Sequence, residues 1–161
     1  MALKSEFLDA MSGIVSSVAI VTTDGPAGRA GATISAMTSV SADGDAPTML
    51  ICLHHQANAA SAVMQNKCFC INVLNHDQSD IADVFASRTE APDGDKFNAS
   101  DFAISTSGNP QLSNARASFD CRIVSSEQIG THLVIIGAVQ AVTNGTGAPL
   151  LYGNRRYTRA D

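Results

Sequence analysis

The sequence predicts a mainly β fold in which six or seven strands form a barrel with short flanking helices. Three observations support this prediction. Short runs rich in β-branched residues recur between turn-forming residues, residues 119–123 alternate between apolar and polar side chains, and the helical segments are too few and too short for a doubly wound parallel sheet. A length of 161 residues suits a single domain over residues 1–161.

The elements follow from local signals along the chain. Ser5 can cap a short first helix, which Gly13 can end. The next two extended runs are separated by the turn formers Asp24-Gly25-Pro26, so we expect them to pair as a hairpin. A polar stretch at 87–100 is expected to be a surface loop. The expected strands cover residues 15–23, 29–40, 48–53, 68–74, 119–124, 131–143 and 150–157, and two further helices cover 57–65 and 79–86.

The clearest half-buried strand is predicted around residue 120. Phe119, Cys121 and Ile123 occupy alternate positions and should face the core. Asp120 and Arg122 lie between them and should face water, because successive side chains of a strand point to opposite faces.

Composition and charge exclude several classes of function. Lys plus Arg number 10 against 15 Asp plus Glu, and the formal net charge of −5 disfavours binding to nucleic acid. No Trp and only 2 Tyr are present for stacking on bases. The amino terminus lacks a signal-peptide core, and the apolar run 133–139 is too short to span a bilayer. We therefore expect a cytoplasmic protein that binds neither nucleic acid nor membrane.

The four cysteines indicate buried, reduced thiols. They lie in apolar runs, at Cys52, Cys68, Cys70 and Cys121, and do not form a disulfide framework. The Cys68-x-Cys70 pair and the adjacent histidines at 54–55 are the nearest approach to a metal site. Nothing else has ligand spacing, so no metal is expected. The common nucleotide-binding and hydrolase motifs are also absent.

The most informative stretch runs from Gly31 to Ser41, where small hydroxyl residues alternate imperfectly with small apolar ones. Such a strand can bring its backbone close to a flat ligand, whose carbonyls, ring nitrogens or phosphate would accept or donate hydrogen bonds. The alternative is a sheet-edge strand with Ser and Thr facing water, and composition alone favours that alternative.

Eight segments in order resemble the flavin reductase family, the small components of two-component flavin-dependent monooxygenases. Each segment is weakly specific, but together they run in register from about Phe7 to Tyr157. The segments are Gly31–Ser41; Phe69–Leu74; Asp77-Gln78 with Ile81-Ala82 and Phe85-Ala86; Lys96-Phe97; Gly108–Leu112; Phe119–Val124; Gly130-Thr131-His132 with Ile136–Val139; and Pro149–Tyr152 with Tyr157.

The resemblance implies a split β-barrel that binds FMN, or alternatively FAD, in a homodimer with flavin sites near the subunit interface. It implies hydride transfer from NADH or NADPH to the flavin, and reduced flavin for a partner monooxygenase. His132 is the implied catalytic candidate, as a donor that positions the nucleotide. The implied flavin contacts are Thr33, Ile34, Ser35, Ala36, Met37, Thr38, Ser39 and Val40 along the ring and ribityl chain, Cys52, Leu53, Asn58 and Ser61 at the phosphate end, and Phe85, Gly130, His132 and Tyr157 around them.

Two positions depart from the family pattern, and other functions stay open. Thr131 stands where the family usually has Asp, and Ala46-Pro47 stands where two prolines are common. His54 and His55 could donate to a ligand or lie in a solvated turn. The alternative functions are an FMN-dependent corrin reductase and a non-catalytic flavin- or haem-binding protein on the same barrel. A relative of pyridoxamine-phosphate oxidase would need more basic residues than this chain has.

Overall fold

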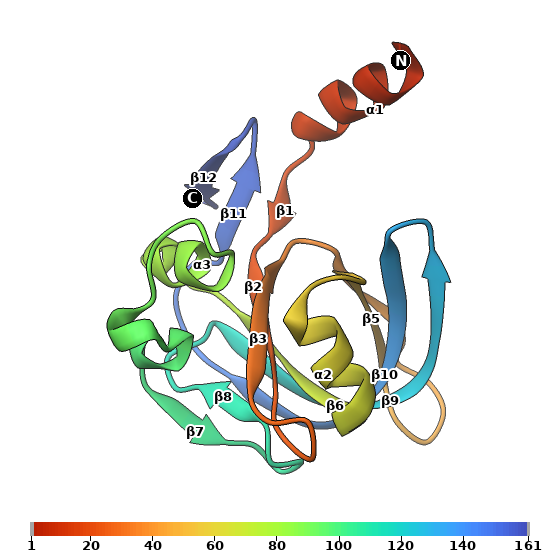
Figure 1. The fold of residues 1–161 in the computed structure, drawn as a ribbon, viewed down its shortest axis with the longest axis vertical. Coiled ribbons are helices and arrows are strands. Elements are labelled where there is room, and N and C mark those ends of the chain that lie inside the picture. Colours follow the sequence, from red (N-terminus) through yellow and green to blue (C-terminus); the bar gives the residue numbers. More distant parts are fainter. Residues whose placement is uncertain (1, 161) are drawn as a thin grey trace.

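The computed structural model describes residues 2–160 and contains a seven-stranded sheet, a three-stranded sheet and a two-stranded hairpin (Figure 1). In chain order the elements are α1 (Ala2–Ser12), β1 (Ser16–Ser17), β2 (Ala19–Thr23), β3 (Ala30–Ile34), β4 (Met37–Ser41), β5 (Thr48–His54), α2 (Asn58–Asn66), β6 (Cys68–Val73), α3 (Ser79–Phe85), the 3₁₀ helices η1 (Pro92–Gly94) and η2 (Lys96–Ala99), β7 (Phe102–Ile104), β8 (Pro110–Leu112), β9 (Ala117–Ile129), β10 (His132–Asn144), β11 (Leu150–Gly153) and β12 (Arg156–Arg159).

The seven-stranded sheet closes into a split barrel. Its order is β3-β2-β6-β9-β10-β5-β4, so β3 and β4 form its two edges. Only Ser35 and Ala36 separate these edge strands in the sequence. The three steps from Ile34 to Met37 span no more than about 11 Å, so these ends of the two edge strands must lie near one another. The Cys52 N–H donates to the Ala36 carbonyl at 3.1 Å, but β3 and β5 form no ladder, which leaves the barrel split between them.

Two apolar clusters occupy opposite faces of the central strands. Inside the barrel, α2 packs its buried face of alanines and Val63 against Phe69 and Ile71. Outside it, α3 covers Ile20 and Leu74. Strand β2 is buried along its whole length because alternate residues enter the two clusters. Each large apolar side chain buried in this way stabilises the fold by about 1.5–3 kcal/mol.

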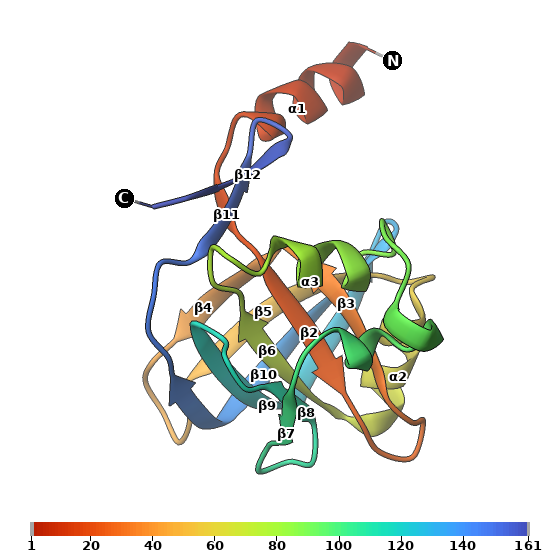
Figure 2. The ribbon, with the colours of Figure 1, turned by 90° about the vertical axis from the view of Figure 1, so that its left-hand side faces the viewer.

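The amino-terminal helix and the carboxyl-terminal hairpin project from the same side of the barrel (Figures 1 and 2). Strand β1 joins β11 and β12 in the three-stranded sheet. Helix α1 buries none of its residues. Within residues 2–160, no helix combines the length and the apolar character needed to cross a membrane.

Three predicted strands are in fact broken. The run 15–23 divides at Val18 into β1 and β2, and the run 29–40 divides at Ser35-Ala36 into β3 and β4. The run 150–157 ends at Gly153, where a turn leads into β12. At the first two breaks local strand propensity continues, but the chain changes its pairing partner, which is a property of the whole sheet. At the third, Asn154 and Arg155 adopt positive φ in the turn that folds β12 back on β11.

Other elements differ in detail. Ser5 lies inside α1 and does not cap it, because the helix begins at Ala2. The predicted loop 87–100 contains η1 and η2, and the β7–β8 hairpin was not predicted. The hairpin of β2 with β3, and α2 and α3, agree with the prediction to within one or two residues.

The prediction that Asp120 faces water is wrong. Its side chain is 1% exposed, because the β7–β8 hairpin and its turn cover that face of β9. The carboxylate accepts hydrogen bonds from the Ser105 hydroxyl at 2.7 Å, the Ser107 N–H at 2.8 Å and the Asn109 amide at 3.0 Å. Three donors offset the cost of burying the charge. Arg122 is exposed, as predicted.

The four cysteines are free thiols. Cys70 and Cys121 are buried, and burial raises the pKa of Cys121 to about 12. Cys52 and Cys68 are half-buried, which corrects the expectation that all four are buried.

Candidate functional site

A first cavity of about 260 Å³ opens where the barrel is split between β3 and β5. Small side chains make up most of its wall, so a ligand can approach the backbone of β3 closely. Strand β3 pairs only with β2, which leaves part of its N–H and C=O groups free of any ladder. The cavity is lined by Ala32, Thr33, Ile34, Ser35, Ala36, Cys52, Leu53, His54, Ala57 and His132.

A second cavity, of about 300 Å³, lies at the other end of β3, and its lining includes two cationic side chains, Arg29 and Lys96. Arg29 lies over the Phe97 ring at 5.1 Å and pairs with Asp24 at 3.5 Å. Lys96 donates to the Phe85 carbonyl at 3.1 Å, and partial burial lowers the pKa of Lys96. The remaining lining residues are Ala30, Gly31, Asn58, Gly94 and Asp95.

The amino terminus of α2 contributes to both cavities, through Ala57 and Asn58 respectively. Its N-cap, Ala57, has no side chain that could accept a hydrogen bond from the first helical turn. Unpaired amides at a helix N-terminus attract anions, so this end of α2 adds positive potential beside Arg29 and Lys96.

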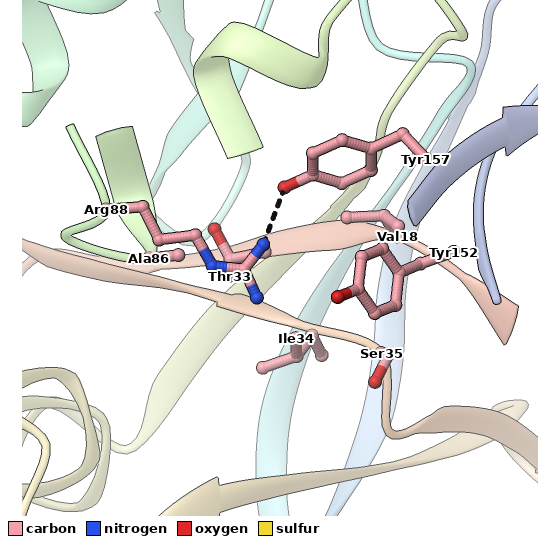
Figure 3. Close-up of a pocket in the computed structure, with 8 residues that line it drawn as sticks. All are labelled: Val18, Thr33, Ile34, Ser35, Ala86, Arg88, Tyr152 and Tyr157. Carbon is pink, nitrogen blue, oxygen red and sulfur yellow. Dashed lines mark hydrogen bonds between the residues drawn. The ribbon is translucent and has the colours of Figure 1, made fainter. Parts of the chain in front are cut away.

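A third, smaller cleft of about 160 Å³ lies on the other side of Thr33, Ile34 and Ser35 (Figure 3). Arg88 and Tyr157 face one another across it, with a hydrogen bond of 3.4 Å. The Tyr157 hydroxyl donates to Asp83 at 2.7 Å. Burial and this hydrogen bond raise the pKa of Tyr157 to about 12, so its hydroxyl stays protonated. The rest of the cleft is Val18, Ala86 and Tyr152.

Three histidines, His54, His55 and His132, gather at the first cavity, and we call them the histidine cluster. His54 and His132 are paired in register on β5 and β10. Their ring centroids lie 5.3 Å apart in an edge-on arrangement, and His55 stacks on His54 at 5.3 Å. In the part of the chain that the structure describes, no group of three or more His, Cys, Asp or Glu is arranged to hold a metal ion.

The structure brings about half of the predicted site residues to these cavities. Those at the first cavity are Thr33, Ile34, Ser35, Ala36, Cys52, Leu53 and His132; Asn58 lies at the second and Tyr157 at the third. Phe85 is 1% exposed and supports β3 from behind, against Gly31. The others lie on β4 (Met37, Thr38, Ser39 and Val40), on the exposed side of α2 (Ser61) and in the β9–β10 turn (Gly130).

Several residues that line the cavities are absent from the predicted flavin contacts, among them Arg29, Ala57, Arg88, Lys96 and Tyr152. Arg29 lies just before the small-residue stretch, and Lys96-Phe97 is one of the family segments. Both signals pointed to this end of the strand. Arg88 and Tyr152 are brought together from distant parts of the chain and left no local signal.

Comparison with known proteins decides the family. Residues 11–161 match the family model described as flavin reductase like domain. A protein of Methylorubrum extorquens named FMN reductase (NADH) RutF 1 is 44% identical over 153 residues, which covers 94% of this chain and 74% of that protein. The chain belongs to the flavin reductase family.

Solved structures of flavin reductases share the fold. The NADH:FAD oxidoreductase of Streptomyces globisporus C-1027, in complex with NAD and FAD fragments, superposes with a TM-score of 0.87 at 25% identity and covers 98% of this chain and 93% of its own. The flavin reductase of the styrene monooxygenase of Pseudomonas putida S12 superposes with a TM-score of 0.83 at 26% identity over 96% and 97%. The predicted mainly β barrel of this reductase family is thus confirmed.

The residues of this flavin reductase fit an FMN molecule. The first cavity offers small side chains and free backbone groups to a flat ring, and the second offers two cations to a phosphate. The six residue steps from Arg29 to Ser35 span about 20 Å of extended strand, which is enough for the ring and ribityl chain to lie along β3.

Replacing Ala36 tests the ring position. Ala36 is exposed and lines the first cavity, so Ala36→Leu should fill the cavity without disturbing the core. We expect FMN affinity, measured by quenching of flavin fluorescence, to fall at least tenfold while the melting temperature stays unchanged. Ala42→Leu, in the exposed β4–β5 loop, is the matched control. Unchanged FMN affinity in Ala36→Leu would place the ring elsewhere.

Proposed function

We propose that this chain is an NADH:FMN oxidoreductase in which the flavin ring occupies the first cavity and the phosphate occupies the second. The arrangement of charge along β3 carries the proposal. A cavity without Lys, Arg, Asp or Glu lies at one end of the strand. At the other end lie Arg29 and Lys96 with the start of α2 and one carboxylate, Asp95. A relative at 44% identity is named an FMN reductase that uses NADH.

Strand β3 and the bend at Ser35-Ala36 hold the ring. Bound FMN supplies the hydride acceptor, and the protein must hold the nicotinamide against it at reaction distance. Backbone N–H groups of β3 and the bend would hold the ring and would stabilise negative charge on it. The hydroxyls of Thr33 and Ser35 differ in availability, because Thr33 donates to the Ala82 carbonyl at 2.6 Å. Ser35 is therefore the hydroxyl assigned to the ligand.

His132 positions the nicotinamide nucleotide. It lies at the start of β10, exposed, across the first cavity from β3. An imidazole there can donate a hydrogen bond to the nucleotide, and direct hydride transfer needs no proton from it. The Thr131 hydroxyl lies 3.0 Å from its Nδ1 and orients the ring.

The remaining flavin contacts proposed from the family resemblance are Met37, Thr38, Ser39, Val40, Ser61, Phe85, Gly130 and Tyr157.

We further propose a homodimer that uses α1. This helix presents four large apolar side chains to solvent: Leu3 (80% exposed), Phe7 (60%), Leu8 (54%) and Met11 (46%). It projects from the barrel and buries none of its own residues within residues 2–160 (Figure 2). A second copy of the chain would remove this apolar surface from water.

Reduced flavin made by this enzyme is proposed to serve a monooxygenase, as the name of the Pseudomonas putida S12 protein indicates for that reductase. We place the protein in the cytoplasm as a single domain, in keeping with its four free cysteines.

Oxidation of NADH tests the function directly. The purified protein should oxidise NADH only when FMN is present, and without oxygen the flavin should bleach as NADH is consumed. The absorbances of NADH and of oxidised flavin follow the two halves of the reaction. Bound flavin that NADH fails to bleach would refute the proposed activity.

Charge introduced on α1 tests the dimer. Leu8→Glu should convert a dimer to a monomer in sedimentation velocity, because it places a charge in the proposed apolar contact. Lys4→Glu on the same helix is the control and should leave the dimer intact. A wild-type chain that sediments as a monomer would contradict the proposal.

A further inference from the structure

The histidine cluster lies at the first cavity, beside the proposed flavin ring, yet only His132 has a role in the proposed function. His54 ends β5 and lines the same cavity. Its ring is held on two sides, by the stacked His55 and by the edge-on His132. The His55 N–H also donates to the Thr131 carbonyl at 2.9 Å, which ties this turn to the start of β10. The three rings therefore form a fixed arrangement.

Local hydrogen bonds set which nitrogen of each ring faces a ligand. The Gln56 N–H donates to Nδ1 of His54 at 3.2 Å, so a neutral His54 carries its proton on Nε2. The Thr131 hydroxyl can donate to Nδ1 of His132 at 3.0 Å and select the same form. Each ring then keeps one N–H donor free, and the two rings are neighbours at one cavity.

The N–H donors of the cluster are available to an acceptor group of a ligand. None of the ion pairs found among residues 2–160 involves these histidines. Thr131 adds no charge beside His132. The cavity has no Lys or Arg in its lining, since Arg29 and Lys96 lie in the second cavity. An acceptor group that reaches this side of the first cavity can therefore take hydrogen bonds from the imidazoles.

We propose that His54 and His132 together bind the pyrophosphate of NADH. This inference rests on the proposed function and adds His54 as a second residue that positions the donor. The ring centroids lie 5.3 Å apart, so their two N–H donors can reach different oxygens of one diphosphate. The phosphate of FMN stays with Arg29 and Lys96, and the two nucleotides are held at separate anion sites.

Two hydride donors that differ in the pyrophosphate test this role. NADH carries it, and dihydronicotinamide riboside has the same reactive ring but lacks both the pyrophosphate and the adenosine. His54→Ala should raise the KM for NADH about tenfold or more, the effect expected for one hydrogen bond to a charged group. The KM for the riboside should change less than twofold, and FMN affinity should fall by a smaller factor than NADH affinity, because His54 also lines the flavin cavity. His54→Gln, which keeps a side-chain N–H donor, should recover most of the affinity for NADH.

His76→Ala is the matched control, because His76 is exposed and lies outside the cavities, with its N–H on the Ala148 carbonyl. The double variant His54→Ala/His132→Ala should lose less NADH affinity than the sum of the single variants, since both residues hold one group.

The inference is overturned if His54→Ala leaves the KM for NADH unchanged, raises the KM of both donors equally, or weakens FMN binding by the same factor. Wild-type protein that oxidises neither donor would refute the proposed function itself, which separates the two failures. Because His54 is exposed, its variants should fold, and the ratio of the two KM values within each variant is independent of the amount of folded enzyme.

Discussion

The connection through Ser35 and Ala36 constrains the rest of the molecule. Two residues join the two edges of a seven-stranded sheet, so the sheet must curl until β3 and β4 lie close together. Strand β4 then pairs with β5, while β3, on the other side of the bend, pairs with β2 and leaves its second side without a partner strand. The first cavity is the opening left by this incomplete closure. The binding site is thus a consequence of the topology and needs no specialised catalytic side chain.

Two features let a ligand use that opening. Small residues along β3 and on α2 leave the backbone accessible, and Gly31 accommodates the Phe85 ring, which a Cβ would approach to 2.6 Å. Charge is concentrated at the far end of the strand, where Lys96 is anchored on the Phe85 carbonyl and Arg29 lies over Phe97. Phe85 therefore couples the two cavities: its ring supports the strand and its carbonyl fixes the cation.

Sequence patterns were sufficient for elements whose causes are local. The turn at Asp24-Gly25-Pro26 correctly predicted the β2–β3 hairpin, and the alanine-rich segment correctly predicted α2. They failed where distant segments decide the outcome. Asp120 is buried because Ser105 and Asn109 are folded over it. The family resemblance supplied Thr33–Ala36, which line the first cavity, but it placed Cys52-Leu53 at the phosphate end, and they line the cavity that we assign to the ring. It could not show that the strand bends there, or that Arg88 and Tyr152 meet across a cleft.

The direction of the flavin along β3 is the central claim, and comparing FMN with riboflavin tests it most directly. Riboflavin has the same ring and ribityl chain but no phosphate. Equilibrium binding should show that Lys96→Ala weakens FMN about tenfold and riboflavin less than twofold, while the control Lys4→Ala changes neither. An equal loss of affinity for both flavins, or no loss for FMN, would contradict the placement of the phosphate beside Lys96.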